Sequence, residues 1–331
     1  MKHIDIGSEK RQYAKNKIRD KMKHKHGDDV DGWLIIDKPK DMGSTQVVGK
    51  TRYLLQAKKN GHTGTLDPFA TGVLPIAFGE ATKLVPFVTD GDKEYEFIIK
   101  WGEQTSTDDT EGEVVARTDK IPTHDEIVTV LPRFIGKIIQ IPPMYSAIKI
   151  NGKPAYTLAR KGQSVEMPAR QIEIYGLELL EEYADSAKFK VQCSKGTYVR
   201  TLGKDMAEKL GTLGHLIELR RTKCGNFDLK SKILLDSLEK IEYVEERRKL
   251  LLPLETSLRD IAEVAVSAED ARKLSVGQGL SPKNYADLSV GNLAAAMFHN
   301  CLIALLRVDE HKLSPIRVFN NILQKEIKDV D

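Results

Sequence analysis

Short apolar segments with two different periods alternate along the chain from Gly32 onwards, and this alternation limits the fold more than any other feature of the sequence. The segment GWLIIDKP (32–39) predicts a buried strand that ends at a proline, and VLPIAFG (73–79) predicts another. EYEFIIKWG (94–102) places Tyr95, Phe97, Ile99 and Trp101 on one face, as a half-buried strand does.

Helical segments are predicted between and after these strands. Thr123 and Glu126 form a capping box for a helix over 124–134. After Ser44, which we interpret as an N-cap, residues at helical spacing are Val47, Val48, Thr51, Leu54 and Leu55. Other predictions are helices over 80–90 and 200–209, and strands around 138–150, 170–181 and 187–193. This mixture favours an α+β fold with a mixed or antiparallel sheet over a doubly wound parallel one.

The composition changes near residue 252, which predicts a domain boundary there. Residues 237–252 are predicted to form a charged amphipathic helix that closes a first domain over 31–252. Beyond it, Gly277, Gly279 and Pro315 punctuate a small β-rich module, which we place at 253–320, before a tail over 321–331.

The chain has 331 residues, of which 40% are hydrophobic, enough for two domains with real cores. It has no apolar run of about 18 residues and no signal-peptide pattern, so we expect a soluble cytoplasmic protein without a membrane partner. Cys193, Cys224 and Cys301 form no CxxC pair, so neither a disulfide framework nor a metal site is predicted.

The net charge of +3 hides an uneven distribution. Residues 1–27 contain nine Lys or Arg and three Asp or Glu, a balance of +6, which leaves −3 on the remaining chain. We interpret residues 1–30 as a basic N-terminal extension, either a phosphate-attracting arm or a solubilising segment. Any nucleic-acid surface on the body must then be a local basic patch.

The most informative segment is GHTGTLDPFATGVLPIAFG (61–79), which has Asp67 near its centre. Its glycines and small residues predict a tight loop between a helix and a strand, where the backbone approaches a ligand closely. Taken alone, an aspartate before a proline is typical of an ordinary turn.

The string 61–74 resembles the active-site loop of the TruB family of tRNA pseudouridine synthases, which in bacteria act on uridine 55. Further matches follow in the family's order, and together they extend from Gly32 to about Asn226: DKPKDMGST (37–45), DKEYEF (92–97), CSKGTYVRTL (193–202) and HLIELRRTKCGNF (215–227). The resemblance implies a largely antiparallel central sheet of the pseudouridine synthase type and a small C-terminal PUA-like domain.

The resemblance implies a catalytic set of Asp67, Tyr95 and Arg200. The reaction isomerises a uridine without redox change, so no cofactor is expected. Asp67 acts as nucleophile or base and must be ionised, and Arg200 is the cation that keeps it so when RNA desolvates the site. Tyr95 is a stacking surface or a proton acceptor.

The resemblance also implies which residues contact the substrate, the T-stem-loop of tRNA, whose target uridine is extruded from its loop. His62 enters the space around the displaced nucleotides, Tyr198 stacks on the base, Leu219 forms an apolar wall, and Lys38 supports the catalytic loop and belongs to the binding set. A local basic patch is expected from Lys149, Lys153, Arg160, Lys161, Arg220 and Arg221, which position phosphates without reading sequence.

Three alternatives stay open at this stage. A tRNA-binding chaperone would have the same fold but no need for a buried carboxylate. A hydrolytic glycosidase normally uses two carboxylates, and the catalytic loop has only one. Guide-RNA-dependent relatives have a more developed C-terminal domain, so the short module here favours a stand-alone bacterial enzyme, expected to be a monomer without an obligatory protein partner.

Overall fold

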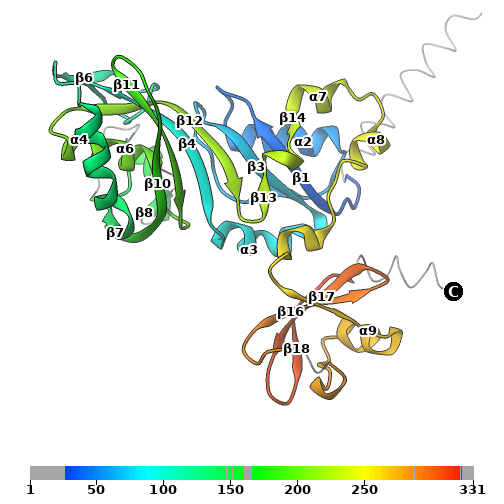
Figure 1. Ribbon diagram of the computed structural model, residues 1–331. Helices are drawn as coiled ribbons and strands as arrows, with labels where there is room; N and C mark the ends of the chain where they lie inside the picture. The colour runs from blue at the N-terminus through cyan, green and yellow to red at the C-terminus, as the bar shows by residue number, and fades with distance from the viewer. Residues whose placement is uncertain are drawn as a thin grey trace, which may run out of the picture.

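The computed structural model describes residues 27–146, 148–150, 152–159, 166–285, 288–320 and residue 322. The N-terminal extension up to residue 26, Arg160, Lys161 and most of the predicted tail lie outside the described residues. Figure 1 shows two parts, a large part built on a long sheet and a smaller C-terminal sheet below it.

The large sheet has ten strands, and its main path runs β14-β1-β3-β12-β4-β11-β10-β7, with β2 paired to β3 and β13 to β12. Two described pairs, β1–β14 and β3–β12, are parallel, and the others are antiparallel, which confirms the predicted mixed, largely antiparallel sheet. The strands are β1 (Gly32–Lys38), β2 (Asn60–His62), β3 (Thr71–Phe78), β4 (Lys93–Trp101), β7 (Gly136–Gln140), β10 (Arg170–Glu182), β11 (Ser186–Cys193), β12 (Gly214–Cys224), β13 (Phe227–Asp228) and β14 (Ile233–Leu234).

The helices of the large part cover the sheet and follow the predicted segments closely. Residues 124–134 form α4 (His124–Val130), whose capping box by Thr123 and Glu126 is present, followed by the 3₁₀ turn η2 (Leu131–Phe134). Other helices of this part include α2 (Ser44–Leu54), η1 (Gly79–Leu84), α3 (Val85–Asp90), α5 (Ala155–Ala159) and α6 (Val199–Lys209).

Two helix predictions were wrong in detail. Gly43, not Ser44, is the N-cap of α2, because the Ser44 hydroxyl is occupied by hydrogen bonds with the backbone of Leu66. The helix predicted over 237–252 is two short helices, α7 (Leu235–Lys240) and α8 (Val244–Arg248). The chain after α8 is extended because Leu252 exchanges both backbone hydrogen bonds with Trp33 of β1.

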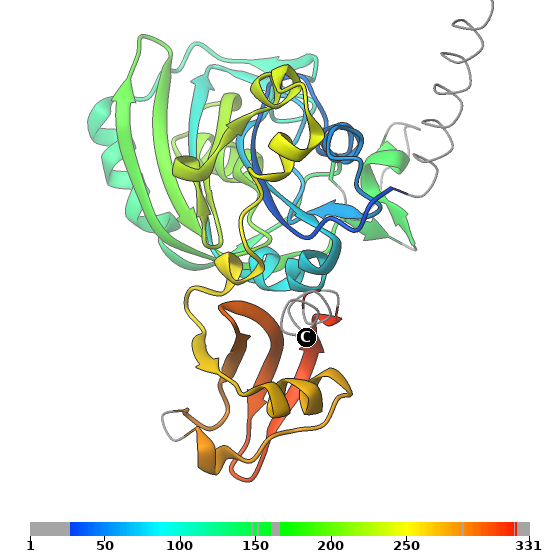
Figure 2. The same ribbon diagram turned by 90° about the vertical axis from the view of Figure 1, so that its right-hand side faces the viewer.

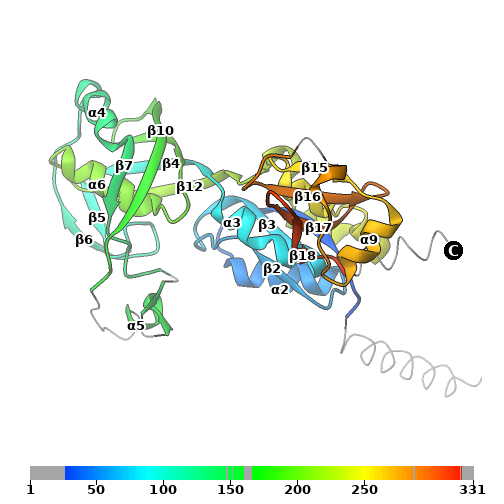
Figure 3. The ribbon, with the colours of Figure 1, turned by 90° about the horizontal axis from the view of Figure 1, so that it is seen from below.

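The predicted strand around 138–150 was also wrong as a single element. β7 ends at Gln140, and a loop leads to a small hairpin of β8 (Lys149–Ile150) and β9 (Lys153–Pro154), followed by α5. Figure 3 shows that α5 projects away from the end of the sheet where β7 and β10 lie. A second hairpin, β5 (Glu103–Thr105) and β6 (Val114–Arg117), follows β4.

The C-terminal part is a four-stranded sheet in the order β15-β16-β17-β18, with α9 (Ala268–Ser275) packed against it. Its strands are β15 (Ala262–Ala265), β16 (Leu293–Phe298), β17 (Cys301–Val308) and β18 (Leu313–Val318). Figures 1 and 2 show this sheet below α3. The predicted β-rich module is thus present, while its PUA-like identity and the domain limits at residues 30, 252 and 320 stay predictions.

The C-terminal part explains why β1 is apolar on both faces. Leu34 and Ile36 point into the main core, whereas Trp33 and Ile35 belong to a second core that contains Leu305 and Phe319 of the C-terminal part. Because a strand alternates its faces, a continuous apolar run requires cover on both sides. In the described part of the chain, no helix is long and apolar enough to cross a membrane.

Gly72 allows β3 to lie against β12 beside the catalytic loop. Its φ is 103°, and a β-carbon there would lie 2.2 Å from the Arg221 carbonyl oxygen. We expect Gly72→Ala to lower the free energy of unfolding by about 2–4 kcal/mol, measured by urea denaturation. Gly49→Ala, in the exposed middle of α2 with open space around it, is the matched control and should stabilise the protein by about 0.5–1 kcal/mol. Equal effects of the two changes would contradict the assigned role of Gly72.

Candidate active site

The loop that carries Asp67 connects β2 to β3. The side chains of Lys38 and Ser44 hold it in place by hydrogen bonds. The Lys38 ammonium is fully buried and donates hydrogen bonds to the carbonyl oxygens of Met42 (2.6 Å), Pro39 (2.9 Å) and Pro68 (3.0 Å). The Ser44 hydroxyl donates to the Leu66 carbonyl and accepts from the Leu66 N–H, both at 2.8 Å. All three ammonium donors of Lys38 are used in holding the loop, as its predicted supporting role requires, and its place in the binding set stays a prediction.

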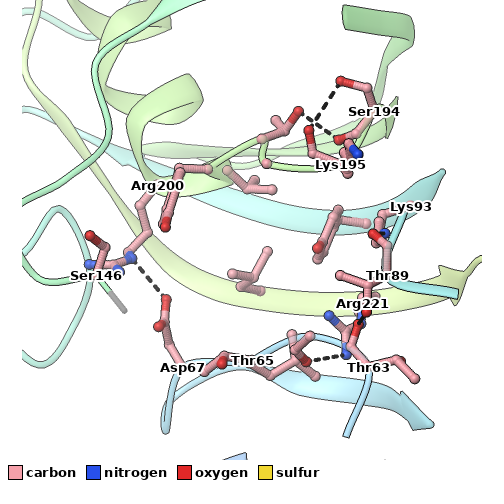
Figure 4. Close-up of a pocket in the computed structure, with 18 of the residues that line it drawn as sticks. Thr63, Thr65, Asp67, Thr89, Lys93, Ser146, Ser194, Lys195, Arg200 and Arg221 are labelled. Atoms are coloured by element: carbon pink, nitrogen blue, oxygen red, sulfur yellow. Dashed lines mark hydrogen bonds and ion pairs between the residues drawn. The ribbon is translucent and has the colours of Figure 1, made fainter. Parts of the chain in front are cut away.

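Asp67 and Arg200 form an ion pair, drawn as a dashed line in Figure 4. Arg200 lies in the first turn of α6, only 3% of its side chain is exposed, and its Nε lies 2.9 Å from Asp67 Oδ2. The side chain of Asp67 is 33% exposed, so the carboxylate remains open to a ligand while its cation is buried. The cation that sequence resemblance assigned to Asp67 is therefore in contact with it.

A second carboxylate, Asp109, holds the other end of the guanidinium. Its Oδ2 lies 3.4 Å from Arg200 Nη1, and 2% of its side chain is exposed. Asp109 Oδ1 accepts hydrogen bonds from the Thr107 hydroxyl and the Glu111 N–H. Sequence reasoning missed Asp109, because two adjacent aspartates in the polar segment TSTDDTEG (105–112) are also typical of a solvated turn.

Two backbone carbonyls complete the surroundings of Arg200. Nη1 donates to the Thr107 carbonyl at 2.9 Å and Nη2 donates to the Tyr145 carbonyl at 2.7 Å. The guanidinium thus contacts two carboxylates and two backbone carbonyls, which together fix the orientation of its plane. A single ammonium group does not reproduce this arrangement.

The electrostatic balance at Asp67 decides its protonation. Burial raises the pKa of Asp67 above its ordinary value of 3.8, the Arg200 guanidinium opposes this shift, and the neighbouring Asp109 carboxylate raises the pKa again. The net direction is upward, so Asp67 binds its proton at a higher pH than a free aspartate does.

We expect this shift to set the acid limb of the pH profile. If Asp67 is the reacting carboxylate that the sequence resemblance implies, its ionised form is the active one, and kcat/KM should fall as the pH is lowered through an apparent pKa above 3.8. The measurement is kcat/KM against pH at constant ionic strength, with RNA binding followed over the same range. An acid limb at or below 3.8 would contradict the assigned environment of Asp67.

Asp67 lines a cavity of about 530 Å³ together with four residues predicted for the site: Tyr95, Tyr198, Leu219 and Arg200. The cavity lies within the common size range of small-molecule sites. Burial raises the pKa of Tyr95 to about 12, so the environment disfavours its ionised phenolate form. The Tyr198 ring packs against Arg170, whose guanidinium carbon is 5.4 Å from the ring centroid.

Other predicted residues lie outside this arrangement or have a different role. Arg221 also lines the cavity but is 1% exposed and donates to the carbonyls of Val73 and Gly64, so it supports the wall rather than a phosphate patch. Arg220 forms a bidentate pair with Asp37, at 2.8 and 3.0 Å. Arg221 is thus buried, Arg220 is already paired, and the six-residue basic patch stays a prediction.

The two remaining binding candidates, His62 and Lys149, do not line the cavity. His62 ends β2, and its Nδ1 accepts a hydrogen bond from the Gly64 N–H at 3.2 Å. Lys149 is exposed on the β8–β9 hairpin. Among the described residues, no group of three or more His, Cys, Asp or Glu side chains is placed to hold a metal ion.

Two solved structures share this fold over most of their length. The structure titled "Crystal Structure of a Cbf5-Nop10-Gar1 Complex" has a TM-score of 0.65 and 28% identity, and the match covers 87% of this chain and 84% of that one. The archaeal box H/ACA sRNP Nop10–Cbf5 complex, with a TM-score of 0.63 and 24% identity over 87% and 85% of the two chains, has the same fold.

Sequence comparison identifies the protein family more closely than the fold does. Residues 52–199 match the N-terminal domain of TruB family pseudouridylate synthases, and residues 200–259 match the tRNA pseudouridylate synthase B C-terminal domain. The tRNA pseudouridine synthase B of Caulobacter vibrioides is 46% identical over 305 residues, covering 90% of this chain and 98% of that protein. That of Agrobacterium fabrum is 45% identical, covering 88% and 96%. The chain belongs to the TruB family of pseudouridine synthases, which confirms the resemblance of its loop motifs.

Proposed function

We propose that this enzyme converts uridine 55 in the T-loop of tRNA to pseudouridine, with Asp67 as the attacking or basic carboxylate. The observation that carries the proposal is the ion pair between a partly exposed Asp67 and a buried Arg200 at the wall of a nucleotide-sized cavity. The names of the relatives from Caulobacter and Agrobacterium support tRNA as the substrate.

Each neighbouring residue has a task that its position supports. When RNA covers the cavity, water leaves and the cost of a charged Asp67 rises, which Arg200 offsets because it is already desolvated and oriented. Leu219, 6% exposed, and Tyr95 provide the flat apolar surfaces that an extruded uracil requires. Tyr198, which also lines the cavity, stacks on or closes over the base.

The RNA itself contributes the geometry that the enzyme recognises. His62 and Lys149 lie outside the cavity wall, where they contact displaced nucleotides and phosphates of the T-stem-loop. Such contacts position the RNA, so selection of uridine 55 comes from the shape of the loop and from the flipped base. A monomer acting on an isolated T-stem-loop, without a protein partner, is sufficient for this mechanism.

The proposal is tested by incubating the protein with an unmodified T-stem-loop RNA and mapping pseudouridine by chemical modification and primer extension. The anticodon stem-loop of the same tRNA, which also contains uridines, is the control RNA. We expect pseudouridine only at position 55 of the T-stem-loop. Binding and refolding of tRNA without any product would instead support a tRNA chaperone, and product only in the anticodon loop would overturn the assigned specificity.

A further inference from the structure

Five basic side chains line the cavity of the candidate active site, and the protein itself engages four of them. The Lys93 ammonium donates hydrogen bonds to backbone carbonyls in α3 and just after it. Arg200 and Arg221 are held by carboxylates and carbonyls, and Lys195 forms an ion pair with an aspartate of α3. Within the described part of the chain, the guanidinium of the fifth, Arg170, takes part in no hydrogen bond or ion pair.

The contact that Arg170 does make leaves its donors available. The Tyr198 ring covers one face of the guanidinium, with the guanidinium carbon 5.4 Å from the ring centroid. The N–H donors of an arginine lie in the plane of the guanidinium, so stacking on its face does not occupy them. Gly196, with a φ of 81°, lies at one edge, and a β-carbon there would be 3.4 Å from Arg170 Nη1. The glycine therefore leaves this edge uncovered.

Tyr198 is a fixed support for this stack. Gln140, the cross-strand neighbour of Arg170 in the β7–β10 pair, is 1% exposed. Its amide donates to the Tyr198 carbonyl at 3.0 Å and accepts from the Tyr198 N–H at 2.8 Å. Two neighbouring residues thus hold the backbone and the ring of one tyrosine. Because the guanidinium stacks on a ring that is already fixed, less conformational freedom is lost when a ligand binds to it.

The anionic group that an RNA substrate brings to this cavity is the phosphodiester. When a uridine is extruded, its base enters the cavity and its two flanking phosphates reach the opening. The negative charge of Asp67 repels them there, and Arg200 does not offset this repulsion because it is shared with a second carboxylate. A guanidinium with free donors does offset it, and its planar donors match phosphate oxygens.

We propose that Arg170 binds one of the two phosphates that flank the extruded uridine, while its stacked face holds Tyr198 beside the base. The inference rests on the proposed action on uridine 55 and adds a substrate contact to it. Arg170 is not among the basic residues that the sequence motifs indicated, because its role depends on Tyr198, 28 residues further along the chain.

The test removes the charge on each side of the contact in turn. Two T-stem-loop RNAs carry a neutral methylphosphonate in place of the phosphate on the 5′ or the 3′ side of uridine 55. Single-turnover pseudouridine formation at a series of protein concentrations gives the half-saturating concentration. With the original chain, one of the two neutral linkages should raise it about tenfold.

The Arg170→Gln chain should require about tenfold more protein for half-saturation with unmodified RNA, with a change of less than about threefold in the rate at saturation. The same neutral linkage should then add less than about twofold, since the contact is already lost. This variant removes no hydrogen bond or ion pair between described residues, so its Tm should stay close to that of the original chain.

Salt dependence separates a phosphate contact from support of Tyr198 alone. The slope of the logarithm of the half-saturating concentration against that of salt should fall by about 0.7–0.9 in Arg170→Gln, one phosphate contact, and be retained in Arg170→Lys. Arg117→Gln is the matched control, because Arg117 pairs with Glu103, is 71% exposed and does not line the cavity. It should change neither the concentration nor the slope.

Equal losses from the neutral linkage in the original and Arg170→Gln chains, or an unchanged salt slope, would overturn the phosphate contact. Coupling of the neutral linkage to Lys195→Gln in place of Arg170→Gln would reassign it to the neighbouring cation of the same cavity. Absence of product from the original chain with unmodified RNA would overturn the proposed function itself. Product without coupling to Arg170 would overturn only this inference.

Discussion

An Asp67→Asn protein should bind a T-stem-loop RNA and form no measurable pseudouridine. The amide has nearly the size of the carboxylate, so the loop fastened by Lys38 and Ser44 keeps its form. It carries no charge and no carboxylate, so it cannot serve as nucleophile or base, although its amide oxygen can still accept the hydrogen bond from Arg200. Loss of a residue that reacts with the substrate typically costs about 10⁴-fold or more in kcat.

The measurement is single-turnover pseudouridine formation, with RNA affinity determined separately. Asp185→Asn is the matched control, since Asp185 pairs with Lys100 at 3.3 Å on the surface and does not line the cavity. It should retain full activity. Residual activity of Asp67→Asn within about tenfold of the original chain would show that Asp67 is not the reacting group.

An Arg200→Lys protein should lose about 10²–10³-fold in kcat/KM. A lysine supplies the charge but only one nitrogen, whereas Arg200 serves Asp67, Asp109 and two backbone carbonyls with separate donors. Weaker pairing also leaves two carboxylates close together, which raises the pKa of Asp67 further. The acid limb of the kcat/KM profile should therefore move to a higher pH in this variant.

This shift separates an electrostatic role from general damage to the fold, which would lower activity at every pH by the same factor. Arg117→Lys is the control, because Arg117 pairs with Glu103 on the surface with 71% of its side chain exposed. It should leave both rate and pH profile unchanged. An Arg200→Lys enzyme with an unshifted acid limb would contradict the proposed control of Asp67 ionisation.

Most of the fold was predictable because local pattern and tertiary environment agree. Strands β1, β3 and β4 and helix α4 follow from apolar periodicity and a capping box, and each packs as its pattern requires. The prediction failed where distant backbone competed with local preference. Residues 249–252 continue a helical pattern in the sequence, but pairing with Trp33 fixes Leu252 in an extended conformation.

Part of the site was predicted from the sequence, and two of its basic residues have a supporting role in the fold. Asp67, Tyr95, Tyr198, Arg200 and Leu219 were identified through motif resemblance, and they line one cavity. Lys38 and Arg221 were assigned to substrate binding through the same motif resemblance, and Lys38 was also predicted to support the loop. In the fold both are buried and hydrogen-bonded to backbone carbonyls, so their charge supports the loop and the wall.

The sequence by itself determined the elements, the largely antiparallel sheet and the loop that carries Asp67, because periodicity, caps and an extended motif are local properties. Only the tertiary structure decided that Asp109 shares Arg200 with Asp67 and that all three donors of Lys38 are used. It also decided that a second cavity, lined by the carboxylates of Asp108, Asp205 and Glu208, borders α6. These facts depend on contacts between segments far apart in the chain, 133 residues for Asp67 and Arg200. The role of a charged residue is set by the distant partners that desolvate it or pair with it.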